Sequence, residues 1–144
     1  MTAKANIATT RVLLQLPADA AYFRVATDCV AELVRLAGLP ADRYARVIGE
    51  VQLAVQELCV NIATHAFADR EDGWFEVDLQ LQDEALHASF RDRGARFEAA
   101  AEQRPNLEEG QEHGYGLFLI RALVDEVQYT SDAGGNHWHL MKRL

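Results

Sequence analysis

The sequence is poor in cysteine and in basic residues, and each shortage narrows what the chain can be. Only two cysteines, Cys29 and Cys59, occur in 144 residues and they form no CxxC pair, so we expect a reducing, cytoplasmic compartment rather than a disulfide framework. Lysine and arginine number 14 against 22 acidic residues, a net charge of −8. Because nucleic-acid binding needs surplus positive charge, this balance argues against direct nucleic-acid partners.

Long hydrophobic runs are also absent. No segment approaches the ~20 consecutive apolar residues of a membrane span, and no apolar signal-peptide core follows residues 1–6. We therefore expect no membrane association. The rest of the composition, 49% hydrophobic and 25% charged, is typical of a soluble globular protein. The length predicts one domain over residues 1–144.

Hydrophobic periodicity predicts elements in the order β-α-α-β-β-loop-α-β-β. Asp19 and Asp42 are the expected caps of the first two helices, and Gly, Pro and charged residues dominate the long loop at 92–111. This order predicts an α+β two-layer sandwich, with helices on one face of a mixed, mostly antiparallel sheet, because a doubly wound parallel sheet requires strict alternation. The predicted strands are 9–16, 74–81, 85–91, 127–131 and 136–142, and the predicted helices are 18–36, 40–66 and 114–124.

The helix at 40–66 carries three polar residues at successive i, i+4 positions, Glu57, Asn61 and His65. This spacing places them along one ridge of the helix. Asn61 can offer a neutral oxygen to Mg²⁺, and Glu57 can accept a proton or hold a water. A solvated helix face is the alternative interpretation of the same pattern.

Two glycine-containing motifs follow. Asp92-Arg93-Gly94 ends a strand, where a carboxylate can face a ligand and a glycine permits close approach of the backbone. Gly114-Tyr115-Gly116 opens a helix, whose first N–H groups and positive dipole end can bind phosphate. Taken singly, each also fits an ordinary turn or loop-to-helix junction, and neither is a dinucleotide-binding or P-loop motif.

In this order the motifs resemble the Bergerat ATP-binding fold of the GHKL and histidine-kinase-like ATPase superfamily. Residues 57–65 look like the N box of the anti-sigma-factor serine kinases of the RsbW and SpoIIAB type. Residues 92–97 are similar to their G1 box and residues 114–120 to their G2 box, with residues 95–113 as the lid between them.

The resemblance implies a role for each matching residue and ATP and Mg²⁺ as cofactors. Asn61 would ligate Mg²⁺, and Glu57 would be the catalytic base for the attacking hydroxyl. Asp92 would accept the adenine amino group, with Gly94 leaving room for the base. Arg96, Arg104 or His113 would supply positive charge in the lid. The phosphates would be bound at Gly114, Tyr115, Gly116 and Leu117.

Two features depart from the family pattern. Members often carry threonine on the last strand beside the adenine-binding carboxylate, whereas Asn136 and His137 follow Gly135 here. An amide would then substitute for the hydroxyl. The lid also carries acidic residues just before the phosphate-binding glycines, which is unfavourable near ATP unless they face solvent: Glu108, Glu109 and Glu112.

The resemblance implies a serine/threonine-protein kinase that acts as a partner switch. It would phosphorylate a small STAS-type anti-anti-sigma antagonist, bind a sigma factor or another regulator, and form a homodimer. Two alternatives stay open. One is a nucleotide-binding module that sequesters a partner without phosphorylating it, and the other is a detached sensor-type ATPase domain.

His137 and His139 form a weaker pattern. Alternate residues of a strand point to the same side, so the two imidazoles could bind a metal ion. No cysteine or third histidine lies nearby in the sequence, so ordinary surface histidines are the favoured interpretation.

Overall fold

In the computed structural model, which describes residues 10–68, 72–97 and 115–144, one five-stranded sheet has the order β1-β2-β3-β5-β4. All four pairs of neighbouring strands are antiparallel, so the predicted mostly antiparallel sheet is confirmed and no parallel pair occurs among these strands. The strands are β1 (Thr10–Pro17), β2 (Trp74–Gln82), β3 (Ala85–Asp92), β4 (Glu126–Asp132) and β5 (Gly135–Arg143).

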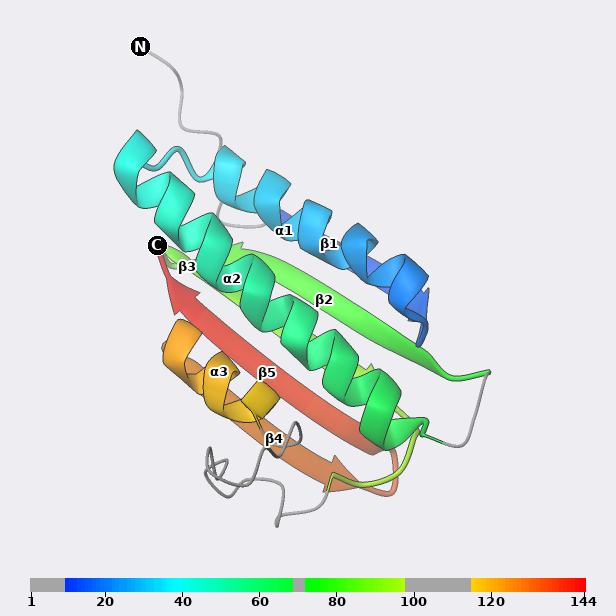
Figure 1. Cartoon of the computed structure of the whole chain (residues 1–144). Coiled ribbons are helices and arrows are strands. Elements are labelled where there is room, and N and C mark those ends of the chain that lie inside the picture. Colours follow the sequence, from blue (N-terminus) through cyan, green and yellow to red (C-terminus); the bar gives the residue numbers. More distant parts are fainter. Residues whose placement is uncertain (1–9, 69–71, 98–114) are drawn as a thin grey trace.

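Three helices lie on one face of this sheet, α1 (Phe23–Leu36), α2 (Ala41–Asn61) and α3 (Tyr115–Leu123). Figure 1 shows α2 along the middle of the sheet, with α1 on the β1 side and α3 on the β4 side. The arrangement is the predicted α+β two-layer sandwich. None of the helices in the described residues is long and apolar enough to cross a membrane.

The helix ends differ from the predictions. Asp19 caps a short 3₁₀ turn, η2 (Ala20–Tyr22), by accepting a hydrogen bond from the Ala21 N–H, and α1 begins only at Phe23. The prediction that Asp42 caps α2 is wrong. Pro40 occupies that position, since its fixed φ suits the approach to a helix and its carbonyl accepts from the Tyr44 N–H.

The last predicted turn of the second helix is a π-helix rather than an α-helix. The segment η3 (Ile62–Ala66) continues directly from α2 after Asn61. π-turns inside α-helices are frequent at functional sites because they redirect side chains. This one lies within the predicted N box.

The sheet has one buried and one open face. Phe75, Val77 and Leu79 of β2 and Phe90 of β3 point toward the helices and are almost fully buried against residues such as Leu58. The alternate residues face the open side, where the strand pairing places Glu76 opposite Arg91 and Asp78 opposite Ser89. The period of two along each strand therefore directs Asp92, the last residue of β3, to the helical side.

Candidate functional site

Asp92 is the buried acidic centre of the candidate site, with 5% of its surface exposed. Its Oδ1 accepts hydrogen bonds from the Gly94 N–H and from Asn136 Nδ2, both at 2.8 Å. Its Oδ2 is buried and has no hydrogen-bond partner among the residues that the structure describes. Burial raises the pKa of Asp92, while the bonds from Asn136 and Gly94 act in the opposite direction. Since buried polar atoms are almost always paired, Oδ2 is an acceptor available to a ligand.

Two glycines hold the backbone around Asp92 in place. A Cβ on Gly94 would lie 2.4 Å from the carbonyl oxygen of Ala66, the same oxygen that accepts from the Ala95 N–H. Gly94 therefore lets the chain after β3 lie against η3. A Cβ on Gly135 would lie 2.1 Å from the Asp92 carbonyl oxygen, and its φ of +117° is one that other residues rarely adopt. Gly135 was not among the predicted site residues, although the pair Gly134-Gly135 at the start of β5 was a visible signal.

The first turn of α3 brings the second glycine motif to the polar ridge of α2. A Cβ on Gly116 would lie 3.0 Å from Asn61 Oδ1 and 3.4 Å from Glu57 Oε2. Both side chains therefore point across to the beginning of α3. Their i, i+4 spacing places them on one ridge of α2. Tyr115 begins α3, and Leu117 is buried in the core, so only the Leu117 backbone is available to a ligand.

A small cavity of about 10 Å³ lies beside Asp92, with room for about one water molecule. Phe97 closes one side and makes edge-to-face contacts with the His65 and Trp138 rings, at centroid distances of 5.6 and 5.2 Å. A purine base is larger than this cavity, so base binding requires Phe97 or its neighbours to shift. The lining is contributed by α2, η3, β3, β5 and the residues after β3: Asn61, Ile62, His65, Ala66, Asp92, Ala95, Phe97, Asn136 and Trp138.

The chemistry of these groups fits a nucleotide with a bound magnesium ion. Asp92 Oδ2 supplies an acceptor for an amino group, and Asn61 Oδ1 supplies a neutral oxygen close to a helix N-terminus. Nowhere in the described residues do three or more His, Cys, Asp or Glu side chains gather as a metal cluster. Mg²⁺ usually keeps several waters and binds through one or two protein oxygens and substrate phosphates, so a dedicated cluster is not required.

Part of the predicted site lies outside the described residues. Gly114, Arg104, His113 and the acidic residues of the lid belong to this part, and only residues 95–97 of the lid are described. Arg96 is exposed, and His65 is exposed at the edge of Phe97.

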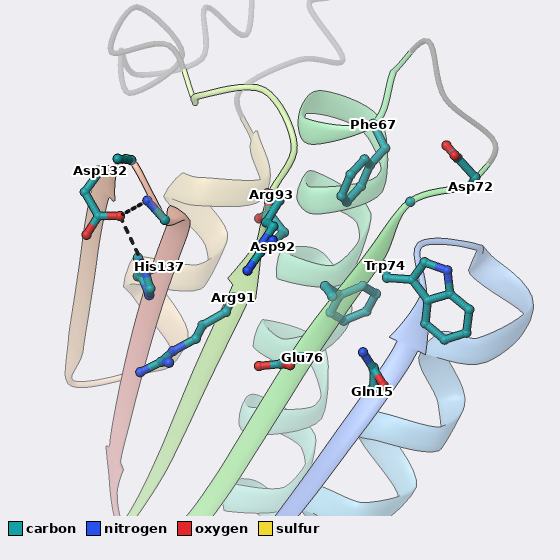
Figure 2. Close-up of a pocket in the computed structure, with 14 residues that line it drawn as sticks. Gln15, Phe67, Asp72, Trp74, Glu76, Arg91, Asp92, Arg93, Asp132 and His137 are labelled. Atoms are coloured by element: carbon teal, nitrogen blue, oxygen red, sulfur yellow. Dashed lines mark hydrogen bonds and ion pairs between the residues drawn. The ribbon is translucent and has the colours of Figure 1, made fainter.

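A larger groove, about 930 Å³, lies at the same end of the sheet and was not predicted. Figure 2 shows Arg91 extending over the open face and Asp132 paired with His137, while Trp74 marks the β2 side of the groove. Arginine and carboxylate side chains both line it, including Arg93. Because these charges are mixed, the lining does not select one class of ligand.

His137 and His139 point to the same side of β5, as the alternation along a strand predicted. Both lie on the open face, but His139 Nε2 lies 3.1 Å from Nδ1 of His87 on the neighbouring strand. Burial, followed by the nearby His87, lowers the pKa of His139, and Glu126 opposes this.

The fold and these motifs define a class of protein. The chain belongs to the histidine kinase-like ATPase domain family, whose family model matches residues 16–142. It is similar to the serine-protein kinase RsbW of Listeria innocua, with 29% identity over 132 residues that cover 86% of this chain and 82% of the relative. The RsbW of Oceanobacillus iheyensis is 26% identical over 129 residues, covering 84% and 79%. The family resemblance expected from the sequence is confirmed.

Solved structures show the same fold. The RsbU and RsbW domains of Rv1364c from Mycobacterium tuberculosis match with a TM-score of 0.67 and 24% identity, over 94% of this chain and 33% of that chain. The histidine kinase domain of the Erythrobacter litoralis blue-light activated histidine kinase matches with a TM-score of 0.57 and 20% identity, over 90% and 62%. This chain spans about a third of the first structure, so that comparison concerns one part of a longer protein.

Proposed function

We propose that this chain is an ATP-dependent serine/threonine-protein kinase that works as a partner switch. The observation that carries the proposal is the buried, unpartnered Oδ2 of Asp92 in a cavity that Asn61 also lines. The similar proteins named serine-protein kinase RsbW support the reaction class.

Asp92 would recognise the base. Its Oδ2 would accept a hydrogen bond from the exocyclic amino group of adenine, and burial would strengthen that bond because water does not compete. Gly94 would contribute by holding the following backbone against η3, which keeps Asp92 Oδ1 occupied by the Gly94 N–H.

Asn61, Glu57 and the start of α3 would act at the phosphate end. ATP with Mg²⁺ supplies the phosphoryl group and neutralises the charge that develops during transfer. Asn61 Oδ1 would ligate the ion, and Glu57 would accept the proton of the attacking hydroxyl. The backbone N–H groups of Gly114, Tyr115, Gly116 and Leu117 would hold the phosphates.

The protein substrate would be a small STAS-type antagonist, and the sequestered partner a sigma factor or another regulator. Phosphorylation adds charge to the antagonist and would change which partner binds. We also propose that the protein works as a homodimer.

Calorimetric titration with ATP and ADP, with and without Mg²⁺, tests the nucleotide site. We expect micromolar-range binding that Asp92→Asn abolishes and that loses its Mg²⁺ dependence in Asn61→Ala. Glu32→Gln, an acid-to-amide change on α1 at an exposed ion pair with Arg35, is the matched control and should bind like the wild type. Absence of nucleotide binding by the wild type would overturn the proposal.

Transfer of labelled γ-phosphate to a purified STAS-type protein tests the kinase step. Glu57→Gln should still bind ATP but transfer no phosphate, because the isosteric amide cannot accept the proton. If the wild type binds both nucleotide and partner without transferring phosphate, the chain is instead a binding module.

A further inference from the structure

We infer that Asn136 and Tyr129 are positioning residues that hold Asp92 in an acceptor-only state and thereby make the base site selective for 6-aminopurines over 6-oxopurines. The inference rests on the proposed function, because it assumes that Asp92 meets the base. It adds Tyr129 of β4 to the amide expected at Asn136 of β5, and it gives the pair a role in specificity.

Asn136 is held by its surroundings in one amide orientation. It is 3% exposed. Its Nδ2 donates to Asp92 Oδ1 at 2.8 Å and to the carbonyl oxygen of Ala95 at 2.9 Å, and the carbonyl of Gly94 lies 3.3 Å away. Three acceptors around one nitrogen exclude the flipped amide, because its oxygen would then face three other oxygens.

Tyr129 completes the network from the other side of the amide. Its hydroxyl donates to Asn136 Oδ1 at 2.6 Å and accepts from the Phe97 N–H at 2.9 Å. The three hydrogen bonds therefore run in one donor-to-acceptor direction, from the Phe97 N–H through Tyr129 and Asn136 to Asp92. Chains of hydrogen bonds with a common direction polarise and strengthen one another.

The two carboxylate oxygens of Asp92 therefore have different roles. Oδ1 already receives two donors, from Asn136 and Gly94, whereas Oδ2 receives none from the described part of the chain. An ionised carboxylate can only accept, so Oδ2 would favour a base that presents an amino group. A 6-oxopurine presents a carbonyl oxygen at that position and would be repelled. Without the Asn136 donor, Asp92 could rotate or take up a proton, and this discrimination would weaken.

The packing of the Tyr129 ring allows its hydroxyl to be tested separately from its ring contacts. Its ring lies 4.5 Å from the Trp138 ring and 5.7 Å from the Phe97 ring, measured between centroids. Tyr129→Phe keeps these ring contacts and removes only the hydroxyl. Asn136→Ala and Asn136→Ser form a second matched pair that differs by one hydroxyl donor.

The experiment measures the dissociation constants of ATP and ITP, with Mg²⁺, for the wild type and these three variants, together with the melting temperature of each. We expect the wild type to prefer ATP by tenfold or more. Asn136→Ala should weaken ATP binding about tenfold with little change for ITP, because it removes a donor to a charged group. Asn136→Ser should recover part of the preference, and Tyr129→Phe should reduce it about threefold. Tyr22→Phe, an exposed tyrosine before α1, is the control and should change nothing.

Equal weakening of ATP and ITP, or no change in either, would show a structural role and overturn the inference while leaving the proposed function intact. If Asn136→Ala fails to fold, Tyr129→Phe and Asn136→Ser decide between the same outcomes. A wild type that binds neither nucleotide would overturn the proposed function and this inference together.

Discussion

At single residues of the site, a feature that favours ligand binding can lower the stability of the fold. Asp92 is the clearest case. Its pKa is raised by burial, so the folded state holds the proton more tightly than the unfolded state does. As pH rises from the ordinary carboxyl pKa through the raised one, the unfolded state loses its proton first and stability falls. Above the raised pKa, the ionised Asp92 therefore costs folding free energy and serves binding.

We predict that Asp92→Asn weakens ATP binding by about 100-fold or more, which calorimetry would register as lost binding. The same change should not lower the free energy of unfolding at pH 7, because the buried charge is removed. Urea denaturation and calorimetry measure the two effects. Asp78→Asn is the matched control, and its expected effect on stability is the opposite one, a loss. The pKa of Asp78 is lowered, chiefly by its hydrogen bond from Arg11, so this variant should lose up to about 1 kcal/mol of stability. A clear loss of stability in Asp92→Asn would contradict the argument.

A substitution at Gly116 should also change nucleotide binding with little effect on stability. Glycine in a helix costs about 1 kcal/mol relative to alanine, but a Cβ at Gly116 would lie 3.0 Å from Asn61 Oδ1. Gly116→Ala should therefore change the unfolding free energy by no more than about 1 kcal/mol while displacing Asn61 and weakening Mg-ATP binding about tenfold. Gly49→Ala in α2, with no atom within 4 Å of the new Cβ, should gain stability and leave binding unchanged. Equal effects of the two variants on binding would contradict this account.

At the scale of elements, the pairing of β3 with β5 makes stability depend on pH. The pKa of His139 is lowered, first by burial and then by His87, so the folded state prefers the neutral imidazole. The stability that this preference contributes is fully present above the unfolded histidine pKa, about 6.5, and is lost as pH falls through the lowered value.

We predict that melting temperature falls between pH 7 and pH 5 and that His139→Gln makes this fall shallower. His87→Gln removes the neighbouring imidazole but leaves most of the burial, so its slope should lie between those of the wild type and His139→Gln. Scanning calorimetry over this pH range measures all three slopes. Identical slopes would show that the histidine pair does not control the acid sensitivity.

For the whole molecule, an ion pair joins the sheet to the helical layer at the end away from the nucleotide site. Lys142 Nζ lies 2.5 Å from Glu50 Oε2 on α2 and donates to the carbonyl of Leu123, which ends α3. The Lys142 side chain is 15% exposed. Lys142 lies six residues beyond Asn136 on β5, or about 20 Å along the strand.

Lys142→Met should lower the free energy of unfolding by about 1–3 kcal/mol, since it leaves Glu50 and the Leu123 carbonyl short of a donor. ATP affinity should stay within about twofold of the wild type, because the site lies at the other end of the sheet. Chemical denaturation measures the change in stability, and calorimetry measures the ATP affinity. A large loss of affinity without loss of stability would show that the two ends are coupled.

Helical and strand periodicity, turn residues and i, i+4 spacing are local properties, so the elements and the motifs could be predicted from the sequence alone. The expected order and bounds agree closely with the structure, apart from the π-turn after Asn61 and the start of α1. Both exceptions depend on how the helix ends meet their neighbours. The family resemblance rests on Glu57, Asn61, Asp92 and the glycines, whose types and spacing are visible in the sequence alone.

Which distant groups meet depends on how the strands pair in the fold. Asp92 and Asn136 are 44 residues apart and become partners because β3 and β5 pair in one register, and Tyr129 joins them from β4. The same register places His139 beside His87. A shift of one residue would turn each of these side chains to the opposite face of the sheet. Register is set by the packing of the entire sheet against α2, so no local pattern could predict the hydrogen-bond network behind Asp92.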